Sequence, residues 1–201
     1  MRKIVITGGV GSGKSEVLNF LKENCNCKVV RADDVAANLM SPNGKCYFDI
    51  INEFSKVNLL EEGSDKKNPP FDKVKLSKLV FSDDEGRRKV NSIVHPAVKE
   101  YILDDVEKCK NEYDYYFLET ALAIEEGYDK LFDETWFIYA QESIRSERLK
   151  KERGYSDERI KEILSAQMSE DIFRSHATKV IDNNGDENEL YHNIRQIIRC
   201  E

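Results

Sequence analysis

The segment KIVITGGVGSGKSEVLNF, residues 3–20, places a glycine-rich motif between two apolar stretches. Residues 8–15 match the pattern G-x-x-x-x-G-K-[ST]. The β-branched run at residues 4–6 is typical of a strand buried on both faces, and apolar side chains recur at helical spacing over residues 17–21. The glycines are therefore expected on a turn that leads from a strand into a helix.

Such a turn predicts a binding site for the phosphates of a nucleoside triphosphate. Glycine lets the backbone curl so that successive N–H groups point at an anion, and the following helix adds its own N-terminal N–H groups and its dipole. We expect Lys14 to reach the β- and γ-phosphates and the Ser15 hydroxyl to hold Mg²⁺. A plain linking turn would need neither residue behind its glycines. The residues expected to bind the nucleotide here are Gly8, Gly9, Val10, Gly11, Ser12, Gly13, Lys14 and Ser15.

The composition suits one α/β domain with helical insertions, because the chain has 201 residues, of which 40% are hydrophobic and 34% charged. A net charge of −7 argues against nucleic acid as the main partner. The five cysteines form no C-x-x-C pair and indicate reduced thiols in a cytoplasmic protein. We expect no signal peptide, because the first strand begins almost at the N-terminus, and no apolar run is long enough to span a membrane.

Four further apolar runs, at residues 28–30, 115–118, 136–140 and 180–181, predict strands, and helical patterns separate them. This alternation predicts βα units and a parallel five-stranded sheet. Apolar side chains over residues 190–198 share one helical face and predict a C-terminal helix.

Two segments interrupt this alternation. The first, residues 41–110, carries prolines and glycines and then regains helical periodicity, which predicts a helical insertion between the second and third strands. The second, residues 141–175, is highly charged and rich in arginine. It could be a solvated helix pair with i,i+4 ion pairs such as Glu147 to Lys151, or a mobile lid whose arginines close on the triphosphate. The phosphate-binding motif upstream favours the lid.

The remaining motifs help to separate the classes of protein that share this turn. A guanine-selective switch would normally carry N-K-x-D after a strand, and the sequence has none. Residues 83–86 fit D-x-x-G, but a type I turn or a helix cap explains four residues in an acidic chain better. Glu119 follows a predicted strand and is a single candidate for the acid that a remodelling ATPase places there; it could equally be an ordinary polar residue at a strand end.

A kinase needs a carboxylate that orients the acceptor hydroxyl and takes its proton. Asp33 and Asp34 directly follow the second predicted strand, and in a doubly wound sheet the carboxyl ends of the strands form the ligand crevice. Both aspartates could also cap the next helix. One of them can cap while the other acts, and the family resemblance described below favours Asp33 for chemistry.

The chain resembles the dephospho-CoA kinase family over nearly its whole length. The segments that carry the resemblance are Thr7–Ser15, Ala32-Asp33, Leu79-Val80-Phe81-Ser82, Ile93-Val94-His95-Pro96-Ala97-Val98, Leu122 with Glu125 and Gly127, Ala166-Gln167, and Val180-Ile181-Asp182-Asn183-Asn184-Gly185. The resemblance implies transfer of the γ-phosphoryl group of ATP, with Mg²⁺, to the ribose 3′-hydroxyl of dephospho-CoA, which is the last step of CoA synthesis.

The resemblance also implies a fold and an organisation. The fold is a three-layer α/β nucleotide-kinase core, to which we assign residues 1–40, 111–140 and 176–201. A helical region that binds the acceptor would occupy residues 41–110, and the lid would occupy residues 141–175. We expect a small-molecule substrate, no nucleic-acid or membrane partner, and a monomer or weak homo-oligomer.

Particular side chains receive roles from the same resemblance. Those implied in catalysis are Asp33, Lys14 and Arg148. Those implied in nucleotide binding beyond the glycine-rich turn are Arg145, Arg153 and Asn183. Those implied at the acceptor are Asp33, His95 and Glu125. His95 could face the CoA moiety or could be structural, and we favour the structural role. From the residues alone, Pro96 is expected to start a helix at its first turn, with His95 extended before it.

Several positions depart from the family pattern. The family's D-A-D is Arg31-Ala32-Asp33 here, and the other departures are Ala121 for a proline, Glu152 (followed by Arg153) for an arginine, and Phe173 for a lysine. The departures leave the phosphate-binding motif intact. They keep open two alternatives: a kinase for a nucleoside or nucleotide acceptor, and a non-catalytic nucleotide- or CoA-binding relative.

Overall fold

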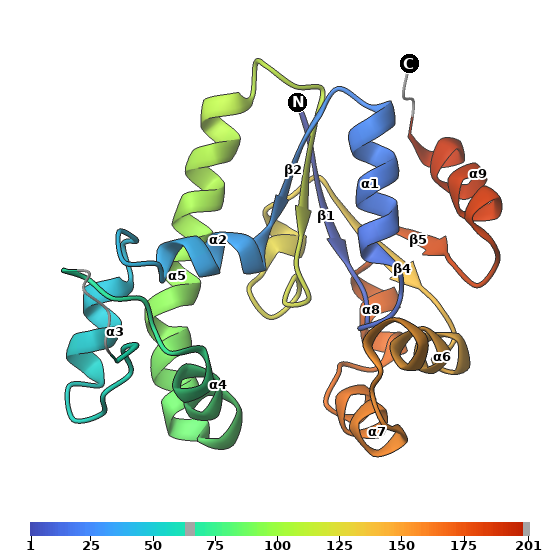
Figure 1. Cartoon of the computed structure of the whole chain (residues 1–201). Coiled ribbons are helices and arrows are strands. Elements are labelled where there is room, and N and C mark those ends of the chain that lie inside the picture. The colour runs from blue at the N-terminus through green and yellow to red at the C-terminus, as the bar shows by residue number, and fades with distance from the viewer. Residues whose placement is uncertain (63–66, 199–201) are drawn as a thin grey trace. The chain divides into compact units, whose positions relative to one another are not determined.

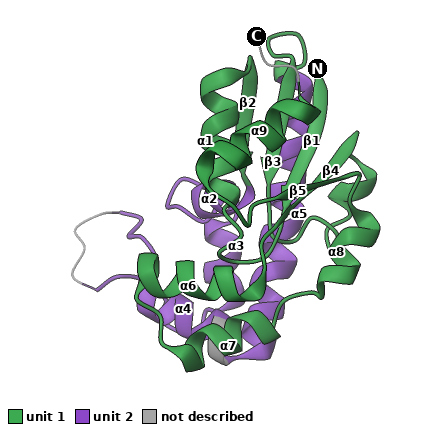
Figure 2. Ribbon diagram, turned by 90° about the vertical axis from the view of Figure 1, so that its right-hand side faces the viewer, with its two compact units in different colours: residues 1–31, 109–201 green, residues 32–108 purple. Residues whose placement is uncertain are grey.

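The computed structural model describes residues 1–62 and 67–198. The chain divides into two compact units, one made of Met1–Arg31 and Cys109–Glu201 and the other of Ala32–Lys108 (Figure 2). Each unit is described by itself below. The first contains the sheet and the glycine-rich turn.

The first unit is built on a parallel five-stranded sheet, as the sequence predicts (Figure 1). Its strand order is β2-β3-β1-β4-β5. The strands are β1 (Arg2–Thr7), β2 (Cys27–Arg31), β3 (Tyr115–Glu119), β4 (Glu134–Tyr139) and β5 (Lys179–Asp182). Because β1 lies at the centre, its carboxyl end delivers the glycine-rich turn to the middle of the sheet edge where ligands bind in such folds.

One face of the sheet is covered by two helices, α1 (Lys14–Asn24) and α9 (Glu187–Ile197) (Figure 1). Ile4 and Ile6 of β1 are fully buried in a cluster that includes Trp136 of β4 and apolar side chains of both helices. The predicted apolar periodicities of the first and last helices are therefore confirmed. Burial of these side chains holds the start of α1 against the end of β1.

A third helix packs on the opposite face. Phe137 points away from its neighbours Trp136 and Ile138, because side chains alternate along a strand. Its ring stacks on Phe173 of α8 (Glu170–His176), with ring centroids 5.0 Å apart. Helices on both faces make this an α/β architecture, as expected.

The arginine-rich segment after β4 is helical. It forms α6 (Glu142–Arg153), α7 (Asp157–Ser165) and then α8. Gly154 ends α6 with a φ of +63°, and the Ser156 side chain caps α7 by accepting the N–H of Arg159 at 3.3 Å.

The described residues of the second unit lie between β2 and β3 and form four helices and an isolated antiparallel bridge between Leu60 and Phe71. Its helices are α2 (Ala32–Leu39), α3 (Tyr47–Glu53), α4 (Lys73–Ser82) and α5 (Asp84–Cys109). Tyr47 and Ile50 of α3 are buried, as are Val94, Val98 and Ile102 of α5. These side chains give the unit an apolar core of its own.

The expectation that Pro96 starts a helix is wrong. Pro96 lies inside the continuous helix α5, and His95 before it is helical rather than extended. A proline inside a helix removes one main-chain hydrogen bond, which is unfavourable in isolation. Here the neighbouring Val94, Ala97 and Val98 are buried, and this packing offsets the lost bond.

The expectation of reduced cysteines is wrong for Cys25, which is disulfide-bonded. Disulfide pairing depends on which side chains meet in space, and spacing along the chain does not reveal it. Cys27 and Cys46 are free thiols, and Cys200 lies outside the described residues. Over the described ranges, no helix combines the length and the apolarity that crossing a membrane requires.

Candidate active site

Steric reasons favour glycine in the turn after β1, as Gly13 and Gly9 illustrate. Gly13 caps α1 with a φ of +89°, where a side chain is disfavoured, and a Cβ there would overlap the side-chain amide of Asn183. At Gly9 a Cβ would overlap the guanidinium of Arg145. Both glycines therefore allow other parts of the unit to approach the main chain of the turn closely.

Lys14 folds back over this turn. Its Nζ donates to the carbonyl of Gly8 at 2.8 Å and to that of Gly9 at 3.4 Å, and it lies 3.8 Å from Oε1 of Glu119. Glu119, which the sequence offered as a single candidate acid, is thus at the end of β3 beside the lysine. The ammonium is held at the position where the phosphates of a nucleotide would meet the N-terminus of α1.

Two hydroxyl groups near the turn lack partners. The side-chain oxygens of Thr7 and Ser12 are buried and form no hydrogen bond within the described part of the chain. Unsatisfied buried polar atoms are rare in native proteins and are common at functional sites. Ser15, the residue predicted to hold Mg²⁺, is exposed in the first turn of α1. The curled main chain, the lysine and an accessible hydroxyl together fit a phosphate group with its metal ion.

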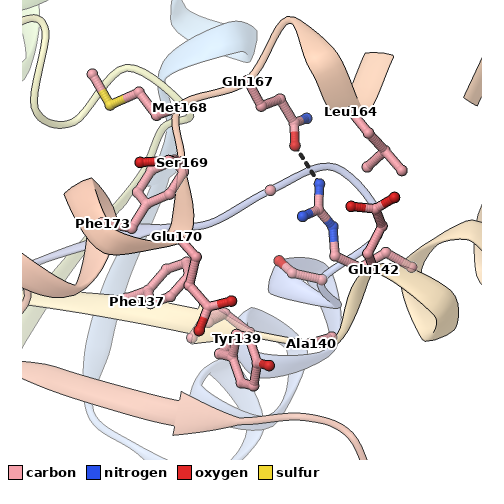
Figure 3. Close-up of a pocket in the computed structure, with 14 residues that line it drawn as sticks. Phe137, Tyr139, Ala140, Glu142, Leu164, Gln167, Met168, Ser169, Glu170 and Phe173 are labelled. Carbon is pink, nitrogen blue, oxygen red and sulfur yellow. Dashed lines mark hydrogen bonds between the residues drawn. The ribbon is translucent and has the colours of Figure 1, made fainter. Parts of the chain in front are cut away.

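Arg145 of α6 contacts the turn directly. Its Nε donates to the carbonyl of Val10 at 2.9 Å, and its Nη2 donates to Oε1 of Gln167 (Figure 3). Burial lowers the pKa of this guanidinium from its ordinary value. Gln167 belongs to the Ala-Gln pair noted in the sequence, and its contact with Arg145 could not be predicted from that pair.

Arg148 and Asn183 form a second connection to the turn. Asn183 is only 5% exposed, and its Nδ2 donates to the carbonyl of Ser12 at 2.8 Å. Arg148 donates to the same carbonyl at 3.4 Å and to the carbonyl of Asn183 at 3.0 Å. The predicted residues Arg145, Arg148 and Asn183 therefore meet at the glycine-rich turn.

A cavity of about 190 Å³ lies beside the turn. Figure 3 shows the aromatic side chains of Phe137 and Tyr139 of β4 and Phe173 of α8 on one side of it and Gln167 on another. The residues that line it are Gly9, Ser12, Phe137, Ile138, Tyr139, Ala140, Glu142, Arg145, Leu164, Gln167, Met168, Ser169, Glu170 and Phe173. Phe173, where the family pattern has a lysine, therefore packs in the wall of this cavity, and Arg145 is the cationic side chain among the lining residues.

Arg153 occupies a different position from the other predicted arginines. Residues 145, 148 and 152 share one face of α6, and position 153 lies about 100° around the helix from position 152. Glu152 stands on the shared face, and Arg153 is exposed in the last turn of the helix. The role of Arg153 stays a prediction.

The residues predicted to bind the acceptor lie in three places. Asp33 is exposed in the first turn of α2, and His95 is half-buried in the middle of α5, so both belong to the second unit. Glu125 is exposed in the turn that follows β3 in the first unit. Their roles in binding an acceptor stay predictions.

The sequence offered no signal for a contact between His176 and Asp129. Nδ1 of His176, at the end of α8, lies 2.8 Å from Oδ2 of Asp129 in the short 3-10 helix Tyr128–Lys130. The Asp129 side chain is 7% exposed, and its other oxygen is buried with no partner among the described residues. The contact ties the end of the arginine-rich segment to the loop after β3.

Comparison with known proteins gives one consistent family. A family model described as dephospho-CoA kinase matches residues 2–189. A dephospho-CoA kinase of Streptococcus pneumoniae strain R6 is 31% identical over 199 residues, covering 98% of this chain and 96% of the relative. A second one, from Oceanobacillus iheyensis, is 35% identical over 184 residues, covering 90% of this chain and 88% of the relative.

Solved structures agree with the fold. A Thermus thermophilus protein is 28% identical, with a TM-score of 0.80 and coverage of 98% of this chain and 95% of that one. A dephospho-CoA kinase from Campylobacter jejuni has a TM-score of 0.71 at 23% identity, covering 98% of this chain and 96% of that one. A shikimate kinase from Acinetobacter baumannii has a TM-score of 0.50 at 12% identity, covering 98% of this chain and 92% of that one. These two likenesses concern the fold alone.

Proposed function

Because the chain belongs to the dephospho-CoA kinase family, we propose that it transfers the γ-phosphoryl group of ATP to the ribose 3′-hydroxyl of dephospho-CoA, giving CoA. The observation that carries this proposal is the family match over residues 2–189, which includes the complete phosphate-binding turn. The reaction would be the last step of CoA biosynthesis.

The geometry around the turn supports the proposed binding of the nucleotide. The main-chain N–H groups at the start of α1 would bind the phosphates, and Lys14 would leave its carbonyl partners to contact the β- and γ-phosphates. Arg145 and Arg148 donate to the carbonyls of Val10 and Ser12. Their remaining N–H groups would stabilise negative charge on the transferring group. Transfer of this kind depends on positioning and charge neutralisation rather than on covalent chemistry by the protein.

Mg²⁺ is part of the proposal, with the Ser15 hydroxyl as its ligand from the protein. When bound, the ion would neutralise negative charge on the phosphates. The hydroxyl is exposed at the first turn of α1, where the phosphates are expected.

The proposed roles of residues in acceptor binding rest on the family resemblance. Asp33 would accept the proton of the 3′-hydroxyl as the hydroxyl oxygen attacks the γ-phosphorus, and the bond to the β–γ bridging oxygen would break as ADP leaves. His95 and Glu125 would contact the rest of the acceptor, and the helical region 41–110 would supply most of its surface. Residues 141–175 would act as a lid that excludes water during transfer.

Other properties belong to the same proposal. The protein would act in the cytoplasm on a small molecule, as a monomer or weak homo-oligomer. A net charge of −7 disfavours nucleic acid as a partner.

An acceptor panel tests the proposal. The purified chain is supplied with ATP, Mg²⁺ and dephospho-CoA, or with adenosine, nucleotides or shikimate in place of dephospho-CoA, and products are identified by mass spectrometry. We expect CoA from dephospho-CoA and a loss of transfer in Lys14→Ala. Phosphorylation of another acceptor in preference to dephospho-CoA would move the chain to a neighbouring kinase class. Calorimetry showing tight binding of ATP and dephospho-CoA without turnover would favour the non-catalytic alternative.

A further inference from the structure

Arg31 is the least expected residue of this site, because the family pattern places an aspartate there. It is the last residue of β2, and its Nε is buried with no hydrogen-bond partner in residues 1–62 or 67–198. A guanidinium is always charged, so a buried N–H without an acceptor is an unfavourable arrangement in the ligand-free chain. The Nε–H of Arg31 therefore lacks an acceptor among the described residues.

The sheet register places Arg31 next to Glu119. The two are direct register partners on the neighbouring parallel strands β2 and β3, which sets their Cα atoms about 4.8 Å apart. Two residues earlier, Val29 and Phe117 belong to the packing around α1. Since side chains two apart on a strand share a face, Arg31 and Glu119 also point to the face that α1 covers.

Glu119 is therefore close to two cations. Lys14, the first residue of α1, lies 3.8 Å from its Oε1, and Arg31 is its neighbour across the sheet. The side chain of Glu119 is 17% exposed, so the carboxylate is poorly hydrated and depends on a cation for stabilisation.

Nucleotide binding would break the contact with Lys14. This inference rests on the proposed use of Lys14 to contact the β- and γ-phosphates. When the ammonium moves to the phosphates, Glu119 loses a cation at the moment when several negative charges arrive nearby. Without compensation, this repulsion would oppose binding.

We propose that Arg31 is a positioning residue that binds the Glu119 carboxylate when Lys14 moves from Glu119 to the triphosphate. The Nε–H of Arg31 then gains the acceptor that it lacks among the described residues. Glu119 stays charged but is drawn along the sheet away from the phosphates, and the lysine is released at low cost. In a chain with an aspartate at position 31, this exchange is impossible.

The test is a double-mutant cycle on ATP affinity, measured by titration calorimetry with ATP and Mg²⁺ and no acceptor. The variants are Arg31→Ala, Glu119→Gln, the double variant, and Arg31→Lys. The control is Lys179→Ala, which also removes a positive charge from a strand residue. Lys179 is exposed and is the first residue of β5, whereas Arg31 is the last residue of β2. We expect Arg31→Ala to weaken ATP binding by about tenfold in the native background and by less than about twofold when Glu119 is glutamine. Arg31→Lys should restore part of the affinity, and the control should be near native.

A second measurement separates this role from a structural one. Because Lys14 holds Glu119 when no nucleotide is bound, Arg31→Ala should leave the thermal midpoint of the free protein within about 2 °C of native and reduce only the increase caused by ATP. A large loss of midpoint without nucleotide would overturn the proposal in favour of a structural role.

Two further outcomes would also overturn it. An equal loss of ATP affinity in both Glu119 backgrounds would mean that Arg31 contacts the phosphates itself. A raised KM for the acceptor with unchanged ATP affinity would place Arg31 in acceptor binding. Since the cycle uses no acceptor, failure to form CoA would overturn the proposed function while leaving the coupling between Arg31 and Glu119 intact.

Discussion

Replacing Asn183 by alanine removes the side chain that connects the end of β5 to the glycine-rich turn. Asn183 Nδ2 donates to the carbonyl of Ser12 at 2.8 Å in a position that is 5% exposed. Its main-chain N–H donates to the carbonyl of Tyr139 at 2.8 Å, and this bond survives the substitution. The perturbation is therefore confined to one buried hydrogen bond and the volume of one amide.

The magnitude follows from what remains at Ser12. Leaving a buried carbonyl wholly unpaired costs about 1–3 kcal/mol, but Arg148 still donates to this oxygen at 3.4 Å. We therefore expect the free energy of unfolding to fall by about 1–2 kcal/mol, which in a chain of this length lowers the thermal midpoint by roughly 2–8 °C. ATP affinity should fall too, because the carbonyl of Ser12 and its peptide plane lose the partner that fixes them.

The assay is urea unfolding of the free protein, followed by ATP titration of the variant. Asn193→Ala is the matched control, since Asn193 Nδ2 donates to the carbonyl of Asp182 at 3.1 Å in an exposed position. The control should change the free energy of unfolding by less than about 0.5 kcal/mol. Equal effects of the two substitutions, or a native ATP affinity in Asn183→Ala, would refute the reasoning.

Three other predictions concern contacts that the sequence did not reveal. Gln167→Ala should raise the KM for ATP about fivefold in initial-rate assays, because Arg145 loses the side chain that accepts its hydrogen bond. Gln167→Glu should keep the KM near native. Equal KM values for the two variants would contradict this prediction. Burial raises the pKa of the Cys27 thiol to about 11. Alkylation of Cys27 at pH 8, measured by mass spectrometry, should therefore be about 100-fold slower than in the unfolded chain. Alkylation at the rate of the unfolded chain would disprove this prediction. His176→Ala should lower the thermal midpoint by several degrees, because the buried carboxylate of Asp129 loses its partner. An unchanged midpoint would show that the contact contributes nothing to the free energy of unfolding.

The parts of the fold that the sequence predicts well are those determined by local pattern. The β-branched run 4–6, the glycines behind it and the apolar spacing over residues 17–21 each report on their own neighbourhood, and together they specify a strand, a turn and a helix. The parallel sheet follows because helical patterns separate the strands. The family resemblance then adds Arg145 and Arg148, both of which the structure places on the turn.

The parts that the sequence misses depend on which elements meet in space. Pro96 has the local signature of a helix start, and only the burial of its neighbours reveals why it lies inside α5. No motif in the sequence indicates the disulfide at Cys25. The contact of His176 with Asp129 joins positions far apart in the chain, with no motif between them. Gln167 could be recognised as part of a family motif, but its role in holding Arg145 requires coordinates.

The most direct test of the account is to locate the transferred phosphoryl group. The chain is mixed with dephospho-CoA, Mg²⁺ and ATP labelled in the γ-phosphate, and the labelled product is digested with a 3′-nucleotidase. The account predicts label in CoA that the 3′-nucleotidase releases completely, and about a thousandfold less of it or none in Lys14→Ala. Label found only in inorganic phosphate, on a position that the 3′-nucleotidase does not cleave, or in undiminished amount in Lys14→Ala would contradict it.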